Sequence, residues 1–213
     1  MKRDDFGLLM DDIYDFTDKI VGTLSRIYIG KFNKLKNISY QELNIMQSVK
    51  VVYEEVDLRT REYYLLLAKK VYKLISEYYD FEFIEEVLTM DWIVKQLELY
   101  DPVTKYVYIH EVERKSARLA EALIASENKV AEIERGRNLW YRQAKQFADN
   151  IVNAAVMQAY DDNDVEYVQW VTEDDERVCA ACDALEGKIF LVSEAPPFQH
   201  IGCRCDKKVW PDD

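Results

Sequence analysis

Proline is nearly absent from this sequence, and this narrows the folds open to the chain more than any other feature does. Residues 1–101 and 103–195 contain no proline, and the 213 residues include only four prolines and six glycines. Both residue types weaken helix interiors, since proline removes a backbone donor and glycine loses the most conformational freedom. Long helices are therefore expected for most of the chain. Hydrophobic residues make up 49% of it, which is enough for a packed core.

Apolar residues at helical spacing predict helices in the first hundred residues. Residues 5–35 have helical character, and a second helix is predicted to begin near Ser39. Ser39 and Glu42 fit a capping box, in which the serine accepts from free N–H groups and the glutamate reaches back to it. Asp101-Pro102 is expected to end a helix, because the residue before proline avoids the helical region. The apolar stripe of the second helix consists of Ile45, Val49, Val52, Val56, Leu67, Val71, Leu74 and Tyr78.

Charge and apolar patterns extend the helical prediction to about residue 160. Residues 111–137 carry six acidic and six basic residues, interleaved, which is typical of a helix with much water-exposed surface. Glu111 and Lys115 stand four residues apart in the order that favours an ion pair. Residues 138–160 are amphipathic, and their apolar side consists of Trp140, Phe147, Ile151, Ala155 and Ala159.

The periodicity changes after residue 160. An acidic stretch at 161–164 indicates a loop, and the β-branched, aromatic run "VEYVQWV" that follows predicts a strand. The segments "KIFLV" and "CDKKVW" are a second and a third short strand by the same criterion. The expected fold class is therefore α+β, with a long α-helical N-terminal region and a small β-rich C-terminal unit. We divide the chain into a helical region at 1–100, a helical stalk at 101–160 and a β-rich module at 161–213.

All four cysteines and one of the two histidines fall in this last module. Their order is Cys179-x2-Cys182, then seventeen residues, then His200-x2-Cys203-x-Cys205. A C-x-x-C turn sets two thiolates on one side of a tight knuckle, and a second group closes the tetrahedron, which is the layout of a structural zinc site. Zinc takes four ligands and five candidates exist. Cys179 and Cys182 are the strongest candidates, and two of the other three complete the set. The fifth does not bind the metal and instead orients one of the ligands.

A bound zinc ion would also explain how so short a segment folds. Residues 165–213 cannot bury a large core alone, and zinc supplies folding free energy on the order of 10 kcal/mol in small peptides. Two other interpretations stay open: disulfides in an extracellular particle, or four unrelated buried thiols. The paired spacing favours metal, as does an N-terminus, "MKRDDFGLLMDDIYDF", that is not a secretory signal and so indicates synthesis in a reducing cytoplasm. A thiolate-rich set with one histidine argues against a catalytic zinc, which needs an open position.

The net charge of −12 lowers the expectation that nucleic-acid binding is the main function. Arg204, Lys207 and Lys208 nevertheless form a small basic spot beside the cysteines, which offers a contact to DNA phosphates or to a partner protein, although Asp206 dilutes it. No stretch reaches about 18 apolar residues, so no transmembrane helix and no membrane partner are expected. The sequence has no glycine-rich phosphate loop and no Ser-His-Asp arrangement that we can support, and we expect no enzyme activity.

The segment "VQWVTEDDERVCAACDALEGKIF" and the later "HIGCRC" resemble the C-terminal module of phage minor head proteins of the Mu F type. The upstream segment "DPVTKYVYIHEVERKSARLAEAL" is similar to the helical part of such proteins, whereas the first 100 or so residues carry no motif. Ile201 stands where the family usually has proline. We expect no toxin or enzyme domain after the module, although some relatives carry one. The matching residues are Trp170, Thr172, Asp175, Arg177, Cys179, Cys182, Leu185, Gly187, Lys188, His200, Cys203, Arg204 and Cys205.

The resemblance implies a virion protein that is made in the host cytoplasm and lies inside the phage head near the portal, in several copies. It implies binding to the portal protein and other head proteins, with a role in head morphogenesis and in DNA packaging or ejection. The zinc would then be structural. Two alternatives remain: a DNA-contacting zinc-knuckle protein of the head interior, and a zinc-dependent enzyme such as a nuclease.

Overall fold

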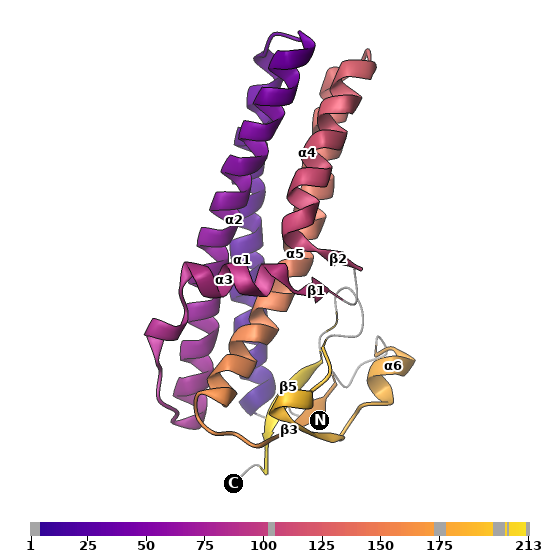
Figure 1. Ribbon diagram of the computed structural model, residues 1–213. Helices are drawn as coiled ribbons and strands as arrows, with labels where there is room; N and C mark the ends of the chain where they lie inside the picture. Colours follow the sequence, from indigo (N-terminus) through magenta and orange to yellow (C-terminus); the bar gives the residue numbers. More distant parts are fainter. Residues whose placement is uncertain (1–4, 102–104, 173–177, 198–202, 204, 212–213) are drawn as a thin grey trace.

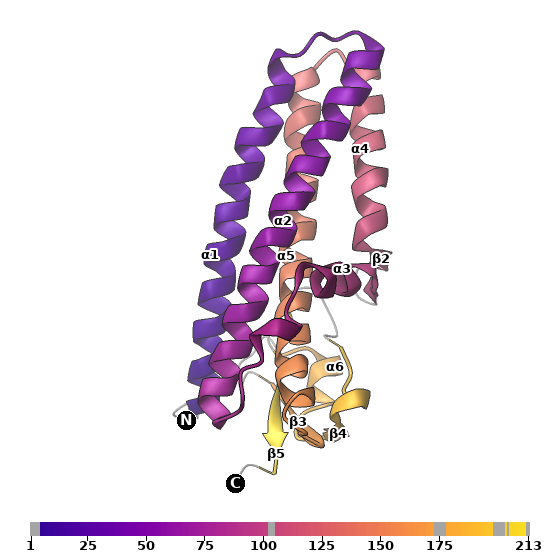
Figure 2. The same ribbon diagram turned by 60° about the vertical axis from the view of Figure 1, so that its left-hand side comes forward.

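Four long helices dominate the computed structural model, which describes residues 5–101, 105–172, 178–197, 203 and 205–211 (Figure 1). The helices α1 (Asp5–Asn33), α2 (Glu42–Tyr79), α4 (Tyr108–Ala125) and α5 (Lys129–Asp161) run alternately up and down as a bundle (Figures 1 and 2). A small strand-containing module lies at the end of the bundle where α1 begins and α5 ends. The predicted α+β class is therefore confirmed.

Short elements connect the helices and build the module. The connections are η1 (Lys34–Asn37), η2 (Glu85–Val87), α3 (Met90–Glu98) and the two-residue strands β1 (Tyr100–Asp101) and β2 (Tyr106–Val107). The module comprises β3 (Tyr167–Val171), α6 (Ala180–Asp183), β4 (Ile189–Leu191), η3 (Val192–Glu194) and β5 (Asp206–Trp210). Its sheet is antiparallel, in the order β4-β3-β5. All three predicted strands are present.

The helical periodicity correctly identified the side of α5 that faces the core. Trp140, Phe147, Ile151, Ala155 and Ala159 are all buried, as predicted. The predicted end of a helix before Pro102 is also confirmed, since α3 ends at Glu98.

Two local predictions were wrong. The capping box at Ser39 does not form, because α2 begins only at Glu42 and Gln41 precedes it without a side-chain cap. In this connection the hydroxyl of Tyr40 donates to the carbonyls of Leu35 and Lys36, 3.3 Å from each. The charged stretch 111–137 spans two helices, since the chain turns at 126–128 between α4 and α5.

Glu111 is more deeply buried than its charged neighbourhood predicted. Its side chain is 3% exposed, and the ammonium of Lys115 lies 3.4 Å from one carboxylate oxygen, as expected for the four-residue spacing. The guanidinium of Arg114 lies 2.6 Å from the same carboxylate. These two cations, opposed by burial, lower the pKa of Glu111. The carboxylate therefore anchors the start of α4.

Aromatic rings fill the middle of the bundle. Tyr53 meets Trp140 edge to face at 5.4 Å between ring centroids, and Tyr108 lies 5.5 Å from the same indole. The hydroxyl of Tyr64 donates to the carbonyl of Ala144, so α2 and α5 are joined by a buried hydrogen bond. Large rings bury the most apolar surface per residue and add edge-to-face attraction, so this cluster contributes strongly to bundle stability.

Strand β5 ties the module to three helices of the bundle. Tyr14 of α1 donates to the Asp206 carboxylate at 2.7 Å, and Tyr160 of α5 donates to the carbonyl of Lys207 at 2.7 Å. The N–H of Val209 donates to the hydroxyl of Tyr79 on α2 at 3.2 Å. The module is thus anchored to the bundle. None of the helices in the described part of the chain is long and apolar enough to cross a bilayer.

Replacing Tyr160 by phenylalanine tests this anchor. We expect Tyr160→Phe to lower the free energy of unfolding by about 0.5–1.5 kcal/mol, because it deletes a buried hydrogen bond without changing the ring. Thermal melting followed by circular dichroism measures the change. Tyr167→Phe, at a 37% exposed tyrosine of the same module, is the matched control and should melt like the wild type. Equal melting of all three proteins would mean that the Tyr160 bond contributes nothing.

The carboxyl of Asp149 makes stability depend on pH. Burial raises the pKa of Asp149 on α5 to about 7, with Asp18 raising it further and Lys145 opposing. The folded-state pKa lies above the unfolded value of about 3.9, so ionisation increasingly destabilises the fold as pH rises from about 4 to about 7. Asp149→Asn should therefore stabilise the protein by about 1–3 kcal/mol at pH 7.5 and by much less at pH 4.

Urea unfolding at the two pH values gives this comparison. Glu54→Gln, which removes a carboxylate with a 60% exposed side chain on α2, is the control and should change stability little at either pH. A stabilisation by Asp149→Asn of the same size at pH 4 and pH 7.5 would contradict the assignment.

Candidate metal centre

The cysteine cluster is built by α6 on one side and by the chain entering β5 on the other. Cys179 is the N-cap of α6, and its sulfur accepts a hydrogen bond from the N–H of Cys182 at 3.4 Å. The hydrogen bond closes the turn of the C-x-x-C sequence, but the sulfur of Cys179 is not among the sulfurs that gather around Cys182. Trp170 of β3 is fully buried and packs with the cluster.

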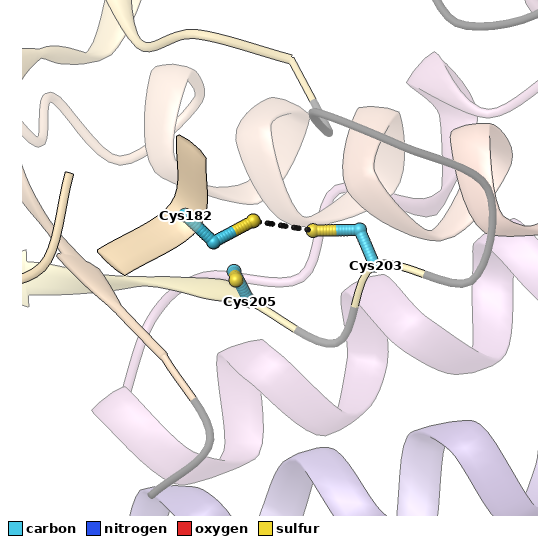
Figure 3. Close-up of side chains that lie close together, drawn as sticks. All are labelled: Cys182, Cys203 and Cys205. Atoms are coloured by element: carbon cyan, nitrogen blue, oxygen red, sulfur yellow. Dashed lines mark hydrogen bonds between the residues drawn. The ribbon is translucent and has the colours of Figure 1, made fainter. Parts of the chain in front are cut away.

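Three of the cysteines point toward one another (Figure 3). The sulfur atoms of Cys182, Cys203 and Cys205 all lie within 4.8 Å of one another, and all three residues are buried. The sulfurs of Cys182 and Cys203 are 3.6 Å apart. A disulfide would bring two sulfurs to about 2.05 Å. Two sulfur ligands of one tetrahedral zinc ion, each about 2.3 Å from the metal, lie about 3.8 Å apart. The observed separation excludes a disulfide between these two sulfurs and is compatible with two ligands of one ion, and none of the four cysteines is in a disulfide in this structure.

The thiols need a cation before they ionise in this place. Burial raises the pKa of Cys182 to about 12. The neighbouring Cys203, followed by burial, raises the pKa of Cys205 further still. Three thiolates side by side would repel one another in a site shielded from water. A divalent cation reverses this, because it deprotonates the thiols that coordinate it. The cluster is thus a group of soft donors that can hold a metal ion.

Lys207 belongs to the interior of the module. Its side chain is buried, the ammonium lies 4.9 Å from the centroid of the Trp170 ring, and it donates to the amide oxygen of Asn153 on α5. Burial lowers the pKa of Lys207 to about 8, while Asp206, Cys203 and Cys205 oppose that change. The interpretation of Lys207 as a surface contact for DNA or a partner is therefore wrong for this structure. The reason is strand geometry, since alternation in β5 turns Lys207 and Val209 to the same face.

The other predicted site residues have different surroundings. Cys179 is partly buried and packs at the edge of the cluster. Lys208 is partly exposed on the opposite face of β5 from Lys207. His200 and Arg204, predicted as a ligand and as a contact, lie outside the described residues. Asn153 was not predicted, because its contact with Lys207 joins residues 54 positions apart and leaves no local signal.

Comparison with known protein families finds a match over residues 105–207. They match the family described as phage Mu protein F like protein, and the match runs from just before β2 to the start of β5. It covers slightly less than half of the chain and includes all four cysteines. Searches of curated proteins and of solved structures find no match. The resemblance carried by the cysteine motif is thus confirmed: residues 105–207 are similar to phage Mu protein F like proteins.

Proposed function

We propose that this protein is a minor head protein that binds the portal inside the phage head, in several copies, and aids head assembly and DNA packaging or ejection. The observation that carries this proposal is the Mu F-like match, because it spans both the helical pair α4–α5 and the cysteine module. The structure adds support of a second kind. A long helical bundle with a small module anchored at one end offers separate surfaces, so it suits a protein that connects two other proteins.

We infer that the protein acts by binding and has no enzyme activity. A catalytic zinc ion keeps one coordination position open to water or substrate. The cluster here offers three buried sulfurs close together, with Cys179 at its edge. Such a sulfur-rich donor set is typical of structural zinc sites, and Cys179 or His200 would fill the fourth position. This supports a structural ion.

We propose zinc as the ion, with Cys182, Cys203 and Cys205 as ligands and Cys179 or His200 as the fourth. Soft, sulfur-rich donors select zinc over magnesium or calcium. With His200 as the fourth ligand the site would carry a charge of −1, which the buried ammonium of Lys207 would balance, and with Cys179 it would carry −2, which Lys207 would balance in part. When bound, the ion would join α6 to the start of β5. It would thereby supply folding free energy that the small module lacks.

The alternative of DNA contact at the module receives less support from the structure. Lys207, one of three cations on which it rested, is 3% exposed and faces Trp170 and Asn153. The sequence of residues 161–213 has fourteen acidic residues against five basic ones, Arg177, Lys188, Arg204, Lys207 and Lys208. Phosphate polymers are repelled by such a surface. We therefore favour a protein partner.

Substitution of the clustered cysteines tests the metal proposal. The purified chain should contain one zinc ion, and Cys203→Ser should lower zinc affinity at least tenfold because one of the buried sulfur ligands is lost. Elemental analysis and competition with a chromophoric chelator measure both. Ser193→Ala, at an exposed serine of η3, is the matched control.

In the Cys203→Ser protein we expect the strand signal of residues 165–213 to be lost while the helices persist. An unchanged sheet without metal would contradict a structural role.

Binding to the portal protein tests the proposed function. Purified chain should bind purified portal protein of the same phage, and electron microscopy of intact particles should place the helical bundle beside the portal inside the head. The purified major capsid protein serves as the comparison and should bind more weakly. If the chain is absent from mature and immature heads, or lies on their outer surface, the proposal is wrong.

A further inference from the structure

The outer face of the C-terminal sheet carries three large apolar side chains. Tyr167, Ile189 and Trp210 remain 37%, 45% and 39% exposed. Tyr167 of β3 stands directly opposite Trp210 of β5, and Ile189 of β4 stands opposite Gln169, two residues along β3. Residues paired across strands, and residues two apart on one strand, point to the same face. The three side chains therefore form one patch, here called the sheet patch.

The chain's own core does not use the sheet patch. Val168 and Trp170, which alternate with patch positions along β3, are fully buried. The inner face of the sheet packs on α5 and on the cysteine cluster, where Lys207 reaches Asn153. An antiparallel sheet with one packed face normally presents polar residues on the other. An exposed apolar patch with an aromatic majority is instead typical of an interface with another protein.

The charge around the sheet patch indicates what kind of partner fits it. Of the residues between 161 and 211 that the structure describes, eight are acidic and three, Lys188, Lys207 and Lys208, are basic. Asp161, Asp164 and Glu166 are exposed immediately before Tyr167, the first residue of the patch. Lys188 is exposed, and Lys208, which the strand register places on the same face as Tyr167 and Trp210, is partly exposed. Complementary charge guides association and excludes wrong partners, so this surface favours a basic partner and disfavours nucleic acid.

We propose that the sheet patch is a docking surface for another head protein, which presents apolar side chains surrounded by lysine or arginine. The aromatic rings and Ile189 would supply the apolar contact, and the acidic residues before β3 would orient the partner. This inference deepens the proposed function and rests on it, since it identifies the partner as a component of the head. It assigns to the sheet a role beyond holding the cysteines.

Incorporation of variants into particles tests the inference. Heads are assembled from co-expressed head proteins, and mass spectrometry counts the copies of this chain per head. Tyr167→Ser with Ile189→Ser should lower the copy number at least tenfold. Leu43→Ser, at a 76% exposed leucine near the start of α2, is the matched control and should incorporate like the wild type. Asp161→Lys with Glu166→Lys should also lower incorporation, because charge reversal repels a basic partner.

The possible results distinguish a failure of the docking surface from a failure of the proposed head-protein function. Normal incorporation of both double variants overturns the inference and leaves the proposed function standing. Absence of the wild-type chain from heads overturns both. If the serine variant melts early, the charge-reversal variant decides. Light scattering that finds a dimer abolished by the serine changes assigns the patch to a second copy. Duplex DNA binding abolished by them assigns it to nucleic acid. Either result overturns a basic protein partner.

Discussion

Three buried sulfurs from two segments that are far apart in the sequence meet at one point of the C-terminal module. Cys182 comes from the short helix α6, whereas Cys203 and Cys205 lie twenty or more residues later, at the entry to β5. The sheet between them has three short strands and one fully buried indole, Trp170. Such a unit buries too little apolar surface to offset its conformational entropy. In the proposed zinc-bound state, the ion would supply folding free energy that the module lacks.

Strand β5 begins next to the cysteine cluster and hydrogen-bonds to three helices of the bundle. From Asp206 to Val209, β5 bonds in turn to Tyr14, Tyr160 and Tyr79, which belong to α1, α5 and α2. Order at the cysteine cluster is therefore linked through β5 to the end of the bundle. This arrangement fixes the direction in which the outer face of the sheet points relative to the long helices. A protein that joins head components benefits from such a fixed geometry, because binding then costs less conformational entropy.

The helices and strands were predictable from the sequence because their signals are local. Proline-free runs and apolar spacing gave the long helices, and the change of period after residue 160 gave β3. Single contacts were harder to predict. The capping box at Ser39 failed because α2 begins three residues later, at Glu42, with Gln41 in the N-cap position. The alternation of β5 contained the signal that Lys207 turns inward with Val209. The contact between Lys207 and Asn153 could not be predicted from local sequence, because it depends on how the module packs against α5.

X-ray absorption at the zinc edge of the purified, reduced chain tests the central claim most directly. We predict one zinc ion per chain, coordinated by three or four sulfur atoms at about 2.3 Å. A shell of oxygen and nitrogen alone would contradict it. So would a metal-free chain whose circular dichroism and melting match those of the zinc-loaded protein.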